Sequence, residues 1–328
     1  MRSLFLLTLT VLSAAAYGSE LLQNLYFIDY ANHLSNLSGH SRVNGVVIPD
    51  RFSQRGLQQT REYVKDQLKS AGYTEILKEN FKVKPNRLGR RTPGINYYVE
   101  IPGRTRPDEV VMIGAHYDSA GFKIKGANDN ASGASAVLTL AQAFKRSGIR
   151  AERTLRFMLF DGEELGFYGS MNHLAQVARR SESLELFVNL DMIAYPLTQH
   201  RSFFFDAREY LPALSDLMHA ANEAMPDDLR MDPRPAPRLY RSDHHYGPYV
   251  GYPAVGLVEH VLDHQGKTLK ISPNYHTTKD VIAPLDLDYA FGIVRFLATL
   301  AETAANSEQS WARTDDLQRR IRYCELLL

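Results

Sequence analysis

The sequence brings carboxylates and a histidine to the ends of apolar runs, where they could bind a metal. V-V-M-I-G-A-H-Y-D-S places His116 and Asp118 after one run, and F-D-G-E-E-L-G-F-Y-G-S places Glu163 and Glu164 after another. A third run, L-F-V-N-L-D-M, ends at Asp191. Like charges a few ångströms apart cannot all stay ionised without compensation. A divalent cation supplies it, and histidine with carboxylate ligands suits Zn²⁺.

Two further residues extend the candidate ligand set. Asp129 precedes a helical stretch in G-A-N-D-N-A-S-G, and His276 lies in Y-H-T-T-K-D. Two metals bridged by one carboxylate suit this many ligands better than one metal. Glu164 would then bind metal while Glu163 acts as the base on a metal-bound water. Each residue alone also has an ordinary structural explanation, such as a helix cap or a buried histidine, so the combination carries the hypothesis.

The elements that must position these residues follow from the apolar pattern. Runs bounded by turns predict strands at 96–101, 110–113, 154–160, 184–190, 201–205 and 254–258. Helical stretches are predicted at 131–145, 165–178, 211–224 and 285–304. This alternation predicts an α/β fold, a three-layer α/β/α sandwich around a mostly parallel sheet. Ligands of such sheets bind beyond the carboxyl ends of the strands, so the candidate residues should converge on one edge.

The N-terminus predicts a targeting segment. Arg2 precedes an apolar run at 4–16, and A-Y-G at 16–18 offers small residues for cleavage, which is typical of a signal peptide over residues 1–18. The run is shorter than the about 20 apolar residues that span a bilayer. The alternative is a buried N-terminal helix. The first interpretation implies an exported protein, secreted or periplasmic.

Residues 19–328 are predicted to form a single domain whose leading part, at about 20–90, is helical. A helical pattern at 57–70 supports that part, and the polar segment 84–93 predicts a loop. The formal charge is +1, which gives no support for a nucleic-acid partner, and no later segment predicts stable membrane insertion. Cys324 is the only cysteine, so no intramolecular disulfide can form. Nothing in the sequence indicates the oligomeric state.

The ordered motifs resemble the secreted co-catalytic dizinc aminopeptidases, the bacterial leucyl aminopeptidase family. The resemblance runs from His116 to Asp280 and implies a phosphorylase/hydrolase-like fold. It also implies that the substrates are peptide or protein N-termini. It implies that His116 and Asp191 bind a first zinc and that Glu164 and His276 bind a second. Asp129 would bridge the two ions, and its peptide bond to Asn130 would be cis. Asp118 would orient His116, and Glu163 would act as general base and acid. Met192, Asp243 and Tyr275 are candidates for the substrate pocket, with the aromatic stretch 246–252.

Alternatives on the same fold remain open. A glutaminyl cyclase would use one zinc, and Asp243 lies where cyclases also place an acidic residue. Against it, Tyr275 stands where cyclases commonly place tryptophan, and L-G-F-Y-G-S follows the glutamate pair as in the peptidases. A non-catalytic binding relative would have lost ligands, and none is missing here. A carboxypeptidase of the same clan would need a basic residue for the substrate carboxylate, for which Arg241 is the candidate.

Overall fold

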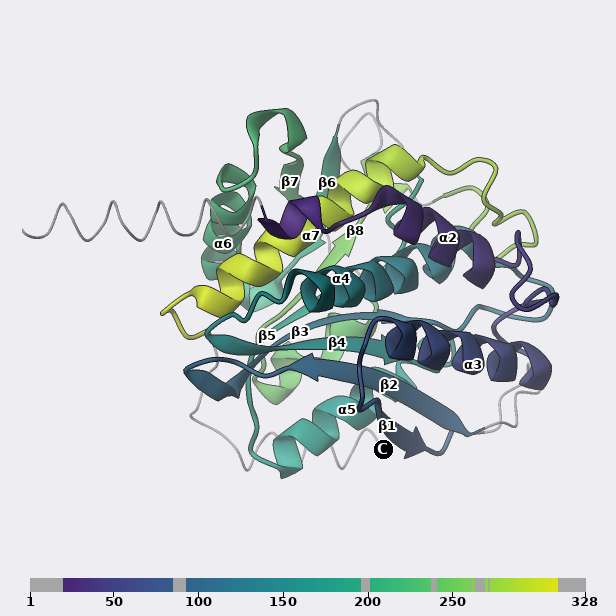
Figure 1. Ribbon diagram of the computed structural model, residues 1–328, viewed down its shortest axis with the longest axis horizontal. Coiled ribbons are helices and arrows are strands. Elements are labelled where there is room, and N and C mark those ends of the chain that lie inside the picture. Colours follow the sequence, from purple (N-terminus) through teal and green to yellow (C-terminus); the bar gives the residue numbers. More distant parts are fainter. Residues whose placement is uncertain are drawn as a thin grey trace, which may run out of the picture.

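The computed structural model describes residues 20–84, 93–195, 201–236, 241–259, 261–262, 269–270 and 272–311. Its centre is an eight-stranded sheet (Figure 1). The strands of that sheet are β1 (Leu77–Phe81), β2 (Gly94–Ile101), β3 (Arg106–His116), β4 (Arg153–Phe160), β5 (Ser183–Leu190), β6 (Ser202–Asp206), β7 (Asp232–Pro235) and β8 (Ala254–Val258). A separate pair of short antiparallel strands is formed by β9 (Val261–Leu262) and β10 (Leu269–Lys270).

The strand order is β1-β2-β4-β3-β5-β8-β6-β7. The four central strands β4, β3, β5 and β8 run parallel, which confirms the mostly parallel sheet. At the outside, β1 and β2 run antiparallel to their neighbours, and β6 pairs antiparallel with β8. The carboxyl ends of β4, β3 and β5 therefore lie at one edge, as the sequence pattern predicts.

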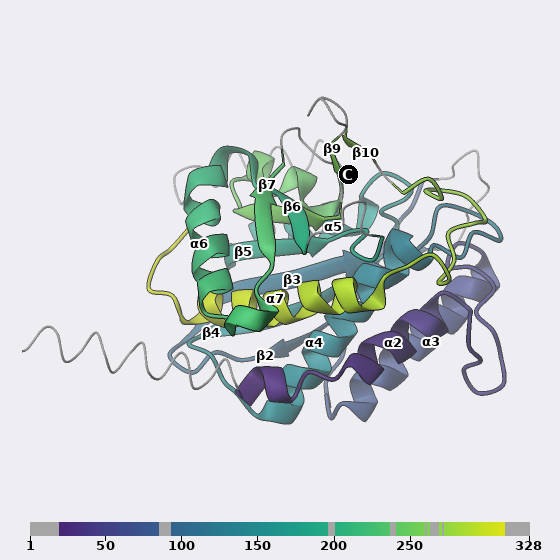
Figure 2. The same ribbon diagram turned by 90° about the horizontal axis from the view of Figure 1, so that it is seen from above.

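Helices cover both faces of the sheet and complete three layers. They are α2 (Phe27–Leu37), α3 (Gln54–Ser70), α4 (Gly133–Ser147), α5 (Tyr168–Arg179), α6 (Leu211–Glu223) and α7 (Leu287–Asn306). Figure 2 shows α5 on the opposite side of the sheet from α2, α3, α4 and α7. Short helical turns are η1 (Ala127–Ser132, interrupted by non-helical backbone at Asp129 and Asn130), η2 (Arg208–Tyr210), η3 (Asp227–Leu229), η4 (Asp243–Tyr246) and η5 (Pro248–Val250).

Alternate residues of the central strands feed two separate cores. In β3, Val111 and Ile113 join the core that contains α2, α3, α4, α6 and α7. Val110 and Met112 join the core that contains α5. A parallel strand buried on both faces favours apolar residues at most positions, and this is why the sequence shows nearly continuous runs there.

Helix ends follow local capping chemistry, with one correction. Ser53 caps α3 by accepting from the Gly56 amide at 3.1 Å, and Asp286 caps α7 by accepting from Tyr289 at 2.9 Å. The expected helix at 165–178 begins three residues later, at Tyr168. The cause is a turn at Gly166 and Phe167, which have φ of 117° and 62°, outside the helical region.

The structure also refines the expected bounds of the elements. β3 is longer than the expected 110–113 at both ends and includes His116, while β1 adds a strand to the leading part at about 20–90.

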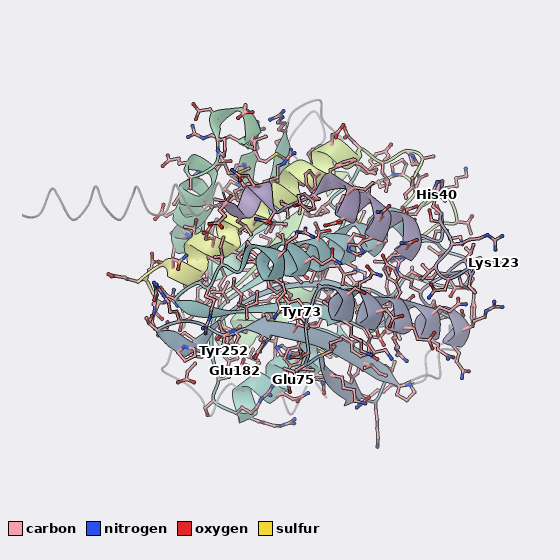
Figure 3. All side chains as sticks on the ribbon, viewed as in Figure 1. His40, Tyr73, Glu75, Lys123, Glu182 and Tyr252 are labelled. Atoms are coloured by element: carbon pink, nitrogen blue, oxygen red, sulfur yellow. The ribbon has the colours of Figure 1, made fainter. Side chains whose placement is uncertain are left out.

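The expected signal peptide and Cys324 lie outside the described residues. Over the described residues, no helix combines the length and apolar character that a membrane span requires. Figure 3 places Lys123, in the loop that follows β3, at the same end of the molecule as His40.

Candidate metal centre

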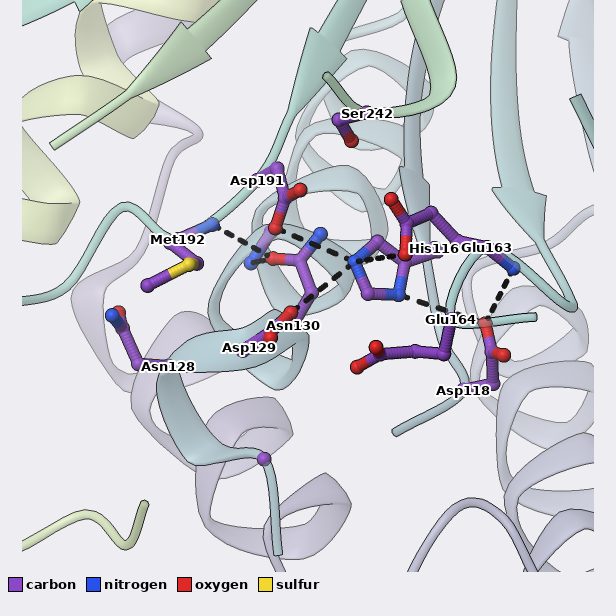
Figure 4. Close-up of polar contacts among 12 residues, drawn as sticks. His116, Asp118, Asn128, Asp129, Asn130, Glu163, Glu164, Asp191, Met192 and Ser242 are labelled. Carbon is purple, nitrogen blue, oxygen red and sulfur yellow. Dashed lines mark hydrogen bonds and ion pairs between the residues drawn. The ribbon is translucent and has the colours of Figure 1, made fainter. Parts of the chain in front are cut away.

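The candidate ligands converge at the carboxyl ends of the central parallel strands (Figure 4). His116 is the last residue of β3, and Asp191 directly follows β5. Glu163 and Glu164 follow shortly after β4, and they begin a turn in which the Gly166 and Phe167 amides donate to the Glu163 carbonyl at 2.8 and 2.9 Å. The fold thus brings three separate strand ends to one place.

His116 lies among the carboxylates and is fully buried. Its Nε2 atom is 3.3 Å from Asp191 Oδ1, 3.4 Å from Asp129 Oδ1 and 3.9 Å from Glu163 Oε2. On the other side of the ring, Nδ1 lies 3.6 Å from Asp118 Oδ1, which accepts a hydrogen bond from the Glu163 amide at 3.2 Å. Asp118 therefore links the imidazole to the backbone of Glu163, in the place where a carboxylate would orient a ligating histidine.

Asp129 lies between two histidines. Its Oδ1 faces His116, and its Oδ2 is 3.1 Å from Nε2 of His276. The same His276 nitrogen lies 2.9 Å from Glu164 Oε2. One carboxylate that presents each oxygen to a different histidine has the geometry of a bridge between two metals.

Potential ligand atoms in the described residues fall into two groups, each with atoms mutually within 4.8 Å. The first is His116, Glu163 and Asp191, and the second is His116, Asp129 and Glu164. Glu163 thus lies as close to the first group as a ligand would, although the sequence pattern assigns it to proton transfer. His276 extends the second group through its contacts with Asp129 and Glu164.

Burial and the mutual repulsion of the carboxylates shift the pKa values of the glutamates upward, while the carboxylates raise the pKa values of both histidines. Burial, with the neighbouring charge of Asp129, raises the pKa of Glu164 to about 8, and burial also raises the pKa of Glu163 well above its ordinary value. Burial lowers the pKa of His276, but hydrogen bonds with Asp129 and Glu164 outweigh it and raise the value to about 10. Without a metal, the two glutamates therefore stay protonated at pH values at which a free glutamate is ionised.

A layer of hydrogen bonds fixes the segment that carries Asp129. The two carboxylate oxygens of Asp280 accept from the amides of Asn128 and Asp129 at 2.9 and 3.0 Å. Glu259 accepts from the Asn128 side chain at 2.6 Å. The Asn130 side chain donates to the Leu190 carbonyl at 2.7 Å, one residue before Asp191. The Asp129–Asn130 peptide bond is cis, as the resemblance implies.

Arg51 holds the same region from the other side. It is fully buried, and its guanidinium donates to the carbonyls of Tyr117 at 2.8 Å, Leu37 at 3.0 Å and Gly126 at 2.7 Å. A buried arginine bonded to backbone carbonyls fixes the loop between β3 and η1 and leaves a positive charge beside the acidic centre.

Sequence reasoning missed Arg51, Asn128, Glu259 and Asp280 as residues of this layer. Glu259 directly follows β8, so the signal that identified Asp191 after β5 could also have identified it. Asn128 and Asp280 lie within the quoted motifs but carry no spacing that predicts their mutual contact. Nothing in the local sequence singles out Arg51.

The three pocket candidates have different settings, and their pocket roles stay predictions. Met192 has φ of 58°, and its buried side chain packs against Phe204 and Val258. The Tyr275 ring is partly exposed and stacks on the His276 ring, with centroids 3.7 Å apart. Asp243 is fully buried, and this burial raises its pKa to about 7.

Two residues of the centre adopt a left-handed backbone. Met192 and His276 have φ of 58° and 56°, a region that non-glycine residues rarely enter. Each such residue costs on the order of 1–3 kcal/mol and persists only where surrounding structure holds it. The Met192 amide donates to Asn130 Oδ1 at 3.3 Å, which ties this conformation to the Asp129 segment.

Comparison with curated proteins gives relatives over part of the chain. Leupeptin-inactivating enzyme 1 of Streptomyces exfoliatus is 35% identical over 166 residues, which cover 50% of this chain and 35% of that protein. Aminopeptidase YwaD of Bacillus subtilis is 26% identical over 186 residues, covering 56% of this chain and 38% of that protein. The chain thus spans little more than a third of the length of these relatives.

Solved structures share the fold. LapB of Legionella pneumophila gives a TM-score of 0.73 at 17% identity, covering 89% of this chain and 75% of that one. Glutaminyl cyclase of Bacteroides thetaiotaomicron gives a TM-score of 0.67 at 14% identity, covering 85% of this chain and 98% of that one. Residues 96–301, well over half of the chain and including every candidate metal ligand, match the family described as peptidase family M28. The chain therefore belongs to peptidase family M28.

Proposed function

We propose that this protein is a zinc-dependent aminopeptidase that removes N-terminal residues from peptides, with Glu163 as general base and acid. The observation that carries the proposal is Asp129, whose two oxygens face His116 and His276 respectively. A carboxylate in that position suits two metal ions held side by side. Relatives named as aminopeptidases support the choice of reaction.

The donor set fits zinc. Two imidazoles and several buried carboxylates offer the nitrogen and oxygen ligands that Zn²⁺ accepts. Glu164 Oε1 is buried and has no hydrogen-bond partner among the described residues, so an oxygen is left for a cation. We assign one zinc to His116, Asp191 and Asp129, and a second to Glu164, His276 and Asp129.

Glu163 is placed to move a proton. Zinc, when bound, would polarise the substrate carbonyl and make water more acidic. Glu163 would take a proton from the attacking water and pass it to the leaving amine. Burial raises the pKa of the Glu163 carboxylate above that of a free glutamate, which suits the step in which Glu163 carries a proton to the leaving amine. Asp118 holds both the Glu163 amide and the His116 ring in place.

The wider setting of the enzyme also belongs to this proposal. We assign peptide or protein N-termini as its substrates, because relatives of the matched region are named as aminopeptidases. The apolar run near the N-terminus supports export by a signal peptide over residues 1–18.

Glutaminyl cyclisation is the second candidate function. Asp243 is fully buried, and its charge acts on both His116 and Glu163, which places an additional acid beside the centre. The structural likeness to a glutaminyl cyclase shows that the same fold accommodates that reaction. A cyclase would use one zinc.

The test combines metal content with two reactions. Purified protein is analysed for zinc and assayed for release of p-nitroaniline from Leu-p-nitroanilide and for cyclisation of a peptide with N-terminal Gln. We expect two zinc ions and amine release, with kcat reduced about 10²–10⁴-fold in Glu163→Gln. Glu62→Gln, an exposed glutamate of α3, is the matched control. One zinc with cyclisation alone would replace the aminopeptidase by the cyclase.

A further inference from the structure

A second set of side chains borders the metal centre and has no role in the proposed hydrolysis. We call it the arginine wall; it consists of Phe167, Arg208, Arg241, His245 and Tyr249. Two chain segments carry most of it. Phe167 ends the turn that begins at Glu163, and its amide donates to the Glu163 carbonyl at 2.9 Å. Arg241 and His245 flank Asp243 along the chain.

The aromatic rings of the wall pack on one another. His245 stacks on Phe167 with centroids 6.0 Å apart and contacts Tyr249 at 5.5 Å. Tyr249 is exposed, and Phe167 and His245 are partly exposed. Within the aromatic stretch 246–252, Tyr252 is buried in the core with α5, and a pocket role for the exposed Tyr249 stays a prediction.

Two guanidinium groups border these rings. Arg241 is exposed, and its guanidinium carbon lies 5.9 Å from the centroid of Phe167. Arg208 lies 5.3 Å from the centroid of Tyr249, donates to its hydroxyl at 3.1 Å and contacts Nδ1 of His245. These contacts use a phenol, an imidazole and π faces, none of which carries a negative charge. The Asp206 carboxylate lies nearby: it accepts from the Arg208 backbone amide at 3.2 Å, lies 3.5 Å from His244, and its charge also acts on His245. Arg208 Nε is buried and has no hydrogen-bond partner among the described residues.

The positive charge of the wall comes from its arginines. Burial lowers the pKa of His245 to about 4, with the charges of Arg208 and Arg241 adding to the effect, so the imidazole is neutral at neutral pH. Because both arginines act on His245, they lie on the same small patch. Ser242, beside Arg241, accepts from Asn189 at 2.9 Å, which fixes this segment close to β5, the strand that Asp191 follows.

We infer that the arginine wall is a substrate subsite that binds a carboxylate carried by the peptide. The inference rests on the proposed aminopeptidase activity. Guanidinium groups match carboxylates by charge and by their planar arrangement of donors, and aromatic surfaces hold them in a fixed orientation. The carboxylate is either an acidic side chain or the free C-terminus of a short peptide.

The experiment separates these two sources with neutral partners of the same size. Values of kcat/KM are compared for Leu-Leu against Leu-Leu-amide, and for Leu-Glu-amide against Leu-Gln-amide. We expect wild-type protein to prefer the carboxylate in one pair by about 3- to 10-fold, and the preference to weaken at high salt. The pair that shows it identifies the source.

Substitutions then assign the preference to the wall. Arg241→Gln and the double variant with Arg208→Gln should each reduce the ratio toward one, mainly through KM. Arg179→Gln, an exposed arginine near the far end of α5, is the control and should leave the ratio unchanged. If the double variant unfolds, the single substitution at the exposed Arg241 carries the test.

Two results would overturn the subsite. Equal rates within both pairs in wild-type protein would show that no carboxylate is recognised. A preference that survives both substitutions would place recognition elsewhere. In both results the peptide amides are still hydrolysed. If the proposed function itself is wrong, none of the four peptides is cleaved, and the subsite is then rejected together with that function.

Discussion

At the scale of single residues, the molecule places ionisable groups where water cannot reach them. In the metal centre a cation can compensate for them. Glu302 of α7 has no such partner: it is 6% exposed, and its Oε1 has no hydrogen-bond partner among the described residues. Burial, with a smaller contribution from the charge of Glu20, raises its pKa from 4.5 to about 7.

This pKa shift predicts that the buried Glu302 lowers the free energy of unfolding as the pH rises. The folded state holds a proton on Glu302 between pH 4.5 and about 7 that the unfolded state releases, so stability present below pH 4.5 is lost as the pH rises. Glu302→Gln should therefore raise the free energy of unfolding at pH 8 by on the order of 1–3 kcal/mol. It should give little or no gain at pH 5. Urea unfolding at both pH values measures this, and an equal gain at both would contradict the titration of Glu302.

At the scale of elements, the junction between η1 and α4 positions the metal centre. The Gly133 amide donates to Asn130 Oδ1 at 2.9 Å, and the same oxygen accepts from the Met192 amide. A Cβ atom at position 133 would lie 2.5 Å from Asn130 Oδ1 and 2.8 Å from the Leu190 carbonyl oxygen. Close approach of the helix to β5 therefore requires glycine there.

Gly133→Ala should consequently destabilise the protein, although alanine is the better helix former by about 1 kcal/mol. We expect a loss of on the order of 1–3 kcal/mol from overpacking, together with weaker zinc retention because Asn130 shifts. Thermal unfolding and zinc content measure the two effects. Gly292→Ala in α7 is the matched control, since its nearest neighbour is the flexible Met231 side chain. A more stable Gly133→Ala protein would show that the junction accommodates the added methyl group.

At the scale of the whole molecule, the metal centre joins the central strands to the loop that carries His276. Residues 128 and 280 lie 152 positions apart yet bond directly, so the centre closes a large part of the chain. Ions bound there should stabilise the fold as a ligand does, since they bind only the folded arrangement.

Removal of metal should therefore lower Tm by about 5–15 °C. The loss should be larger at pH 8 than at pH 6. Without metal, Glu164 and Asp243, with pKa values of about 8 and 7, stay largely protonated at pH 6 and must ionise in a buried site as the pH rises. Scanning calorimetry after chelation, with zinc added back as the control, measures this. An unchanged Tm would show that the centre contributes nothing to stability.

The sequence alone determined the layers and most of the candidate ligands. Burial on both faces favours nearly continuous apolar runs on central parallel strands, and this signal lies within a single segment, as at 157–160 in β4 and 186–188 in β5. Because parallel strands share one carboxyl edge, the positions of His116, Glu163 and Asp191 along the chain were enough to predict that they meet. The start of α5 was wrong because the turn at Gly166 and Phe167 leaves no break in the apolar pattern.

Tertiary structure alone decided how those residues are held. The bonds from Asp280 and Glu259 to Asn128, and the packing of Arg208 and Arg241 around His245, join segments that are distant in the chain. No periodicity encodes such contacts, because a side-chain hydrogen bond depends on the packed positions of both partners. The sequence therefore determined which edge of the sheet carries the chemistry, and folding decided which side chains position it.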